Sequence, residues 1–167
     1  MSIGYSNLFD SSGNPKEIRW EPGQVITVVG RWDMDAALTS ATNTTNTYYK
    51  AQLVPIPADA QITDWRCSVT NLDTGGNTLT FNIGDGNDGT RFASALTIGQ
   101  TGASNRNADA SNGVTITTSS GRINKGLGYR YGAYDTIDFQ VQTAPGTSAT
   151  TGVIQLIVEY YCGPSYY

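Results

Sequence analysis

Turn-forming residues interrupt this chain of 167 residues at short intervals, and the segments between them alternate apolar with polar side chains. Between Ile62 and Thr70, for example, Trp65, Cys67 and Val69 occupy every second position. This period of two places one face of a strand in a core and the other toward solvent. Charged residues make up 14 % of the chain and Gly occurs 19 times, a composition that favours strands and turns over helices. The sequence therefore predicts a single-domain, all-β fold.

About eight antiparallel strands are expected, which fits a β-sandwich of jelly-roll type better than an up-and-down barrel. Their expected positions are 24–32, 48–54, 62–70, 79–83, 92–98, 114–118, 137–142 and 153–161. The first has a β-branched run that predicts a strand apolar on both faces, and 92–98 could instead contain one helical turn. Pro55–Asp59 is expected to bend the chain, because its prolines cannot donate to a ladder. Turn residues at 73–77 and at 144–147 each predict a hairpin between the strands that flank them.

Residues 1–23 contain turn formers without a sustained period, so they are predicted to form an extended N-terminal arm. Residues 24–167 are predicted to form the sandwich domain.

Charge and composition argue against several function classes. The net charge of −4 repels nucleic acid, and no apolar run approaches the roughly 20 residues that cross a bilayer. The N-terminus shows no secretory signal, so synthesis in a cytosol is expected, with Cys67 and Cys162 reduced. Histidine is absent, which removes the commonest general base and metal ligand. We expect neither a nucleic-acid nor a membrane partner.

The acidic residues admit two chemical interpretations. The loop from Asp85 to Gly89 invites comparison with a calcium loop, but its third ligand position is Gly89 and no Glu follows at the twelfth. Asp85 with Asp88, or Asp33 with Asp35, could be nominated as a glycosidase pair. Nothing in the sequence distinguishes these carboxylates from turn residues that bond nearby backbone N–H groups. We therefore predict no catalytic residue, no metal site and no cofactor.

Aromatic residues give a different signal, because ten Tyr and three Trp exceed what a core of this size needs. One group lies in a loop and comprises Tyr129, Tyr131 and Tyr134; a second lies at the C-terminal end and includes Tyr166 and Tyr167. Both groups are candidate protein interfaces, with ordinary surface packing as the alternative.

Several segments together resemble a known family. They are Val54–Asp64, Asn82–Gly86 with Asp88, Arg91–Phe92, Asp135–Asp138, Thr143–Gly146, Gly152–Ile154 and Glu159–Tyr160. In these segments the chain is similar to small structural proteins of tailed bacteriophages, the capsid decoration or cement proteins. The resemblance implies a sandwich or jelly-roll subunit, commonly a homotrimer, that is made in the host cytoplasm. On the outer surface of the virion, it would bridge neighbouring major capsid proteins and stabilise the shell without enzymatic activity.

The resemblance also suggests a role for the arm. It contains apolar residues that could dock into a groove but could not fold alone: Tyr5, Leu8, Phe9, Ile18 and Trp20. The arm is therefore expected to reach along the capsid or into an adjacent subunit. Two alternatives remain open. One is a tail or spike appendage subunit, and the other is a glycan-binding module in which Trp32, Tyr48 or Tyr131 stacks on sugars.

Overall fold

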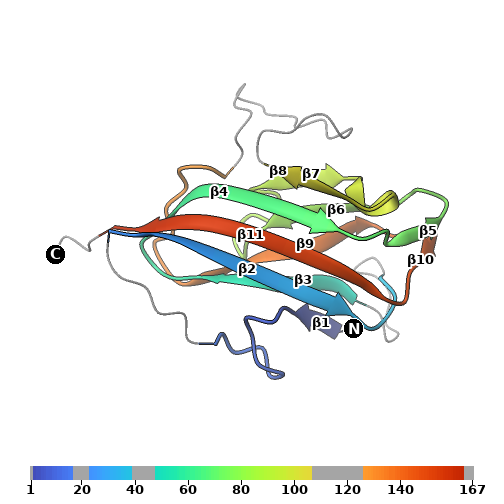
Figure 1. Cartoon of the computed structure of the whole chain (residues 1–167), viewed down its shortest axis with the longest axis horizontal. Helices are drawn as coiled ribbons and strands as arrows, with labels where there is room; N and C mark the ends of the chain where they lie inside the picture. The colour runs from blue at the N-terminus through green and yellow to red at the C-terminus, as the bar shows by residue number, and fades with distance from the viewer. Residues whose placement is uncertain (1, 17–22, 39–47, 107–125, 164–167) are drawn as a thin grey trace.

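The computed structural model describes residues 2–16, 23–38, 48–106 and 126–163, which form two sheets stacked face to face (Figure 1). The front sheet contains, in spatial order, β2 (Val25–Met34), β11 (Gly152–Cys162), β4 (Ala60–Val69) and β8 (Ala103–Arg106). The rear sheet contains β1 (Ser2–Tyr5), β3 (Tyr48–Ile56), β9 (Asp135–Thr143), β6 (Thr80–Gly84) and β7 (Ala93–Leu96). A small corner pairs β5 (Asp73–Gly75) with β10 (Thr147–Ser148). The predicted all-β sandwich is confirmed.

The strand order is that of a jelly roll. Without the short strands β1, β5 and β10, eight strands remain in chain order. The front sheet holds the first, eighth, third and sixth of them, and the rear sheet holds the second, seventh, fourth and fifth. Consecutive strands therefore alternate between the sheets everywhere except at the β6–β7 hairpin.

Both predicted hairpins are wrong for the same reason. The turn at 73–77 was expected to pair the strands on either side, but β4 lies in the front sheet and β6 in the rear sheet. The turn at 144–147 likewise leads from β9 in the rear sheet to β11 in the front sheet. Turn residues mark where the chain reverses, but they do not determine which sheet it enters next.

One buried carboxylate holds this corner together. Asp73 accepts hydrogen bonds from five backbone N–H groups, those of Gly75, Thr78, Leu79, Gly146 and Thr147. The first three belong to the crossing from β4 to β6, and the last two belong to the crossing from β9 to β11. Burial alone would raise the pKa of the Asp73 carboxyl, but these donors together lower it to about 2.

Other local predictions also needed correction. Pro55 lies within β3 rather than in a bend. At this residue β3 pairs with β9 on one side, while on the other side its pairing with β1 has already ended at Gln52. The ambiguous segment at 92–98 contains strand β7, followed by a 3₁₀ helix at Ile98–Gln100. Strand β8 lies between the strands expected at 92–98 and 114–118, where no strand was predicted. The strand predicted at 114–118 lies outside the described residues.

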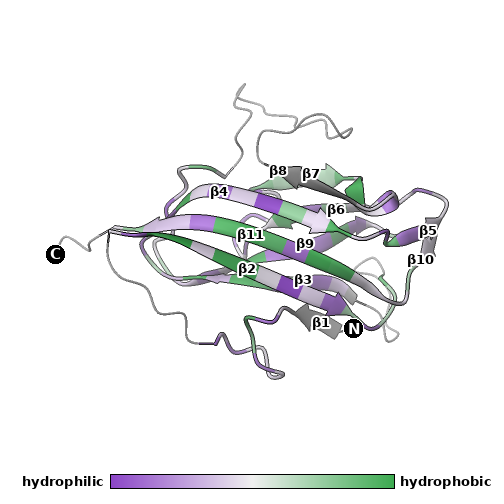
Figure 2. Ribbon diagram, in the orientation of Figure 1, coloured by the Kyte–Doolittle hydropathy of each residue, from purple (hydrophilic) through white to green (hydrophobic). Residues whose placement is uncertain are grey.

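The core fills the space between the sheets with alternate side chains of each strand. Trp65, Cys67 and Val69 are buried as predicted, and burial raises the pKa of the Cys67 thiol to about 12. The rings of Phe81 and Phe139 lie 4.6 Å apart between centroids. Figure 2 shows that hydrophobic residues are frequent along β2 and β11 of the front sheet.

Candidate interaction surfaces

The N-terminal segment, residues 2–16, docks on the same chain. Strand β1 runs parallel to β3, and beyond it the Ser6 N–H donates to the Gln52 carbonyl at 3.0 Å. Asn7 then reaches the front sheet: its N–H donates to the Arg31 carbonyl at 2.7 Å, and its Oδ1 accepts from the Arg31 N–H at 2.6 Å. The segment thus links the edges of the two sheets and covers part of each edge.

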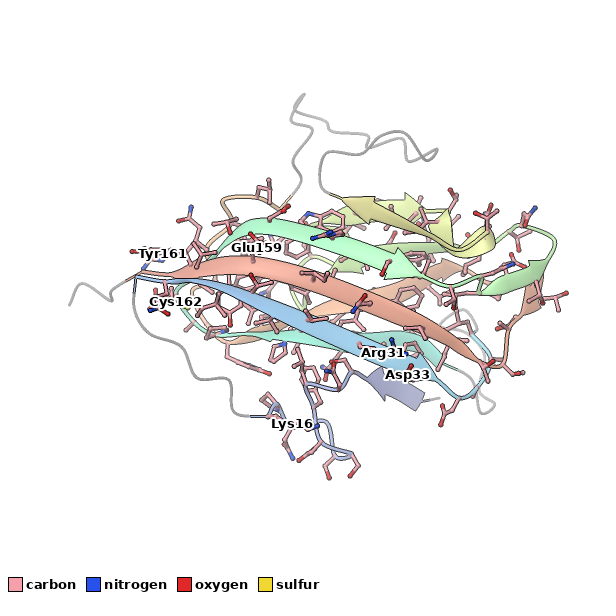
Figure 3. All side chains as sticks on the ribbon, viewed as in Figure 1. Lys16, Arg31, Asp33, Glu159, Tyr161 and Cys162 are labelled. Atoms are coloured by element: carbon pink, nitrogen blue, oxygen red, sulfur yellow. The ribbon has the colours of Figure 1, made fainter. Side chains whose placement is uncertain are left out.

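A compact loop anchors this segment. Phe9 is 4 % exposed and pairs with Pro15, while Leu8 is half-buried against the core. The Asp10 carboxylate accepts from the N–H groups of Ser12 and Asn14, which closes the loop. Lys16 at its end donates from Nζ to the Asn7 carbonyl at 2.8 Å (Figure 3).

These contacts determine which of the predicted arm residues are available to a partner. Phe9 was predicted to be an interface residue, but its side chain is buried within the chain and offers almost no area to a partner. Leu8 keeps part of its surface, and Tyr5 lies in β1 opposite Gln52. The predicted interface residues Ile18 and Trp20 lie outside the described residues. The boundary between arm and domain at residue 23 stays a prediction.

Two of the three loop aromatics, Tyr129 and Tyr131, form a cluster with Asp85 and Arg91. Tyr131 is 2 % exposed, and its hydroxyl donates to Asp85 at 3.0 Å. The Arg91 guanidinium forms an ion pair with Asp85 and lies 3.7 Å from the centre of the Tyr129 ring. Burial, followed by the Asp85 charge, raises the pKa of Tyr131. Tyr131 was predicted to be an interface residue, but its side chain offers almost no area to a partner and instead fastens the 126–131 loop to the turn after β6.

Tyr134 is the loop aromatic that remains available, with 52 % of its surface exposed. Burial of its remaining surface raises the pKa of its hydroxyl, and Asp135 and Asp138 add to this effect. Tyr129 is partly buried under Arg91. Tyr166 and Tyr167 lie outside the described residues.

The carboxylates proposed for metal binding or catalysis have structural partners. Asp85 is buried and also accepts from the N–H groups of Asn87 and Asp88, while Asp88 accepts from Thr90. These bonds confirm that the Asp85–Gly89 loop is a turn held by its own side chains. Exposed Asp33 forms an ion pair with Arg31 at 2.7 Å. Within the described ranges, no group of three or more acidic or sulfur ligands gathers as a metal site would require.

One further carboxylate, Asp138, lies buried on β9. Its Oδ2 is 2.6 Å from the Lys50 ammonium, and its Oδ1 accepts from the Thr136 hydroxyl. Burial outweighs both partners and raises the pKa of Asp138 to about 6.

The front sheet carries exposed apolar residues on its outer face. The β-branched run was predicted to be apolar on both faces of its strand, and two of its valines, Val25 and Val29, are 61 % and 38 % exposed. They lie on the outer face of β2, directly across from Tyr161 and Ile157 of β11, which are partly exposed. Tyr161 and the Arg31–Asp33 pair lie toward opposite ends of this sheet (Figure 3). An alternation that begins at Val25, rather than the β-branched composition, would have identified these residues.

The chain is similar to known proteins in its three-dimensional structure. No protein-family model and no curated protein sequence matches the chain. A chain from the capsid of Ralstonia phage GP4 superposes with a TM-score of 0.65 and 23 % identity, over 98 % of this chain and 100 % of that one. A chain from the capsid asymmetric unit of cyanophage Pam1 gives a TM-score of 0.63 and 22 % identity, over 93 % and 98 %.

This fold occurs in phage capsids. A third likeness, to a chain in the acidic stable capsid of Helicobacter pylori bacteriophage KHP30, has a TM-score of 0.52 and 8 % identity over 84 % of this chain and 94 % of that chain. The resemblance to phage structural proteins seen in the sequence is confirmed at the level of the fold. None of the described segments forms a helix long and apolar enough to span a membrane.

Proposed function

We propose that this chain is a non-enzymatic structural protein of a phage virion that decorates and stabilises the capsid. The observation that carries the proposal is the likeness to two capsid chains over nearly the full length of both partners. The likeness therefore extends over the whole sandwich, and it supports a role of the same kind in a capsid.

In this proposal the protein is made in the host cytoplasm and binds the outer surface of the head as a homotrimer. It bridges neighbouring major capsid proteins and contacts neither nucleic acid nor membrane. Each contact made only in the assembled shell stabilises that shell by mass action, and several copies joined by symmetry add to the effect. The exposed apolar residues of β2 and Tyr134 are available for such contacts.

The glycan-binding alternative loses support from burial. Two of the three aromatic residues considered for sugar stacking, Trp32 and Tyr131, are buried in the core. A tail or spike appendage remains the competing role, because one fold can serve at several places in a virion.

The proposal is tested with particles that lack the chain, made from a phage whose gene for it carries a stop codon. Such heads should assemble but release DNA at a lower temperature than wild-type heads, and adding the purified protein should restore the wild-type temperature. Heads that are equally heat-stable without the chain, combined with particles that fail to adsorb to cells, would instead support the appendage role.

A further inference from the structure

Strand β2 forms a long sheet edge, and the described residues do not guard its first half. Proteins usually protect edge strands with charges, bulges, short length or a covering segment. Strands β7 and β8 are four residues each, and Ala95 in β7 has a φ of 55°, which distorts that edge. Strand β2 is ten residues long and regular in its pairing with β11.

Within the part of the chain that the structure describes, the second half of β2 has protecting contacts and the first half has none. Asn7 occupies both edge-facing backbone groups of Arg31, and Arg31 and Asp33 are charged. Backbone groups alternate in direction along a strand, so those of Val25, Thr27 and Val29 face the same edge as those of Arg31. No described residue makes a hydrogen bond to these groups at this edge. The unguarded stretch is therefore Val25–Val29.

This stretch is complementary to itself. Its edge-facing residues read Val, Thr, Val, the same in either direction, and all three side chains are exposed. An antiparallel copy centred on Thr27 would place Val25 opposite Val29 of the second copy, and Thr27 opposite its own equivalent. Each of these three pairs would exchange two backbone hydrogen bonds. The exposed valines would meet across the new ladder, where branched side chains pack well.

Charge also allows two copies to approach here. No side chain from Val25 to Val29 is charged, and Arg31 and Asp33 further along the strand pair with each other. Among the described residues, the nearest charge is Glu159 of β11, which lies directly across from Thr27. In the paired copies the two Glu159 residues would be separated by three strand spacings, about 14 Å, which exceeds the Debye length of about 8 Å at physiological ionic strength, so their repulsion is largely screened. A five-residue edge buries much less than the roughly 1,200 Å² of a stable interface, so the contact would be weak in dilute solution.

We propose that two copies of this protein associate through the Val25–Val29 edges of β2, antiparallel about a two-fold axis at Thr27. The front sheets of the two copies then form one continuous sheet. A two-fold contact cannot close a trimer, so it is distinct from the proposed homotrimer interface and would join neighbouring trimers. High local concentration on a shell would compensate for its small area.

Disulfide trapping tests the geometry in the full-length protein. In the proposed register Thr27 and its equivalent would have Cα atoms about 5.5 Å apart, within disulfide range. The variant Thr27→Cys should therefore form a covalent dimer under mild oxidation at high protein concentration. The native cysteines are buried, so the added thiol is the accessible one among the described residues.

Two matched controls fix the register. Val25→Cys alone should not dimerise, because the two equivalent residues would lie about 14 Å apart along the strands. A mixture of Val25→Cys with Val29→Cys should form a covalent heterodimer. Adding Val29→Lys to Thr27→Cys should lower the dimer yield about tenfold, since a charge on an edge opposes pairing.

The proposal is overturned if Thr27→Cys dimerises no better than Val25→Cys, or if Val29→Lys leaves the yield unchanged. If Val29→Lys reduces occupancy on particles while Thr27→Cys stays monomeric, a strand of another protein uses this edge and self-pairing is wrong. The trapping is scored in free protein, so it can succeed or fail whether or not the protein binds capsids.

Discussion

Replacing Asp73 with Asn should destabilise the fold in a way that depends on pH. The buried carboxylate accepts five backbone N–H groups from the two crossings that join the sheets, and these hold its pKa at about 2, against an ordinary value of 3.8. A difference of this size corresponds to between about 2 and 3 kcal/mol of stability at neutral pH. An amide keeps the shape of the side chain but has one acceptor oxygen and no charge.

The lowered pKa of Asp73 determines the direction in which stability changes with pH. The stabilising contribution is present above pH 3.8 and is lost as the pH falls toward 2, because the carboxyl must then be protonated in the folded state too. Wild type should therefore be more stable than Asp73→Asn by about 2 kcal/mol at pH 7, with the difference shrinking toward pH 2.

The assay is urea unfolding followed by fluorescence at a series of pH values for both proteins. Asp10→Asn serves as a control, since Asp10 also accepts backbone N–H groups but lies in an exposed loop. A difference between wild type and Asp73→Asn that stays constant from pH 7 to pH 2 would refute the reasoning. So would an equal loss in the Asp10 variant.

Three further changes test other parts of the structure. Gly30→Ala would place a Cβ 2.1 Å from the Leu53 carbonyl oxygen, so thermal unfolding should show a loss of about 2 kcal/mol or more, whereas Gly132→Ala, in open space, should show none. Asp138→Asn should remove a pH dependence opposite to that of Asp73. Because the pKa of Asp138 is raised, its contribution to the stability of the fold is greatest below pH 3.8 and is lost as the pH rises through about 6. In urea titrations, the stability of wild type relative to this variant should therefore fall over that pH range. Phe9→Ala should loosen residues 2–16 while the sandwich stays folded, which hydrogen exchange at the Ser6 and Asn7 amides would detect, and unchanged protection there would contradict the anchoring role.

The sequence correctly predicted those features of the fold that depend on the alternation of apolar and polar residues within one strand. Alternation at Trp65, Cys67 and Val69 correctly assigned a core face, because a strand has the same period wherever it lies. The sheet that each strand joins could not be predicted in this way. That depends on long-range bonds such as those of Asp73, which link segments more than 70 residues apart.

The candidate surface was harder to predict for a related reason. Tyr131 lies in a polar loop that suggests exposure, but its partner Asp85 is 46 residues away in the chain. Val25 and Val29 have side chains typical of a core, and they are exposed because β2 presents only one of its faces to the rear sheet. Side-chain type alone therefore does not decide how exposed either set of residues is.

The central claim is tested most directly by cryo-electron microscopy of the virion that contains this chain. The proposal predicts jelly-roll density on the outside of the head, repeated by the shell's symmetry and in contact with more than one major capsid protein. Density for the chain that is confined to the tail or to a spike, with none on the head, would contradict it.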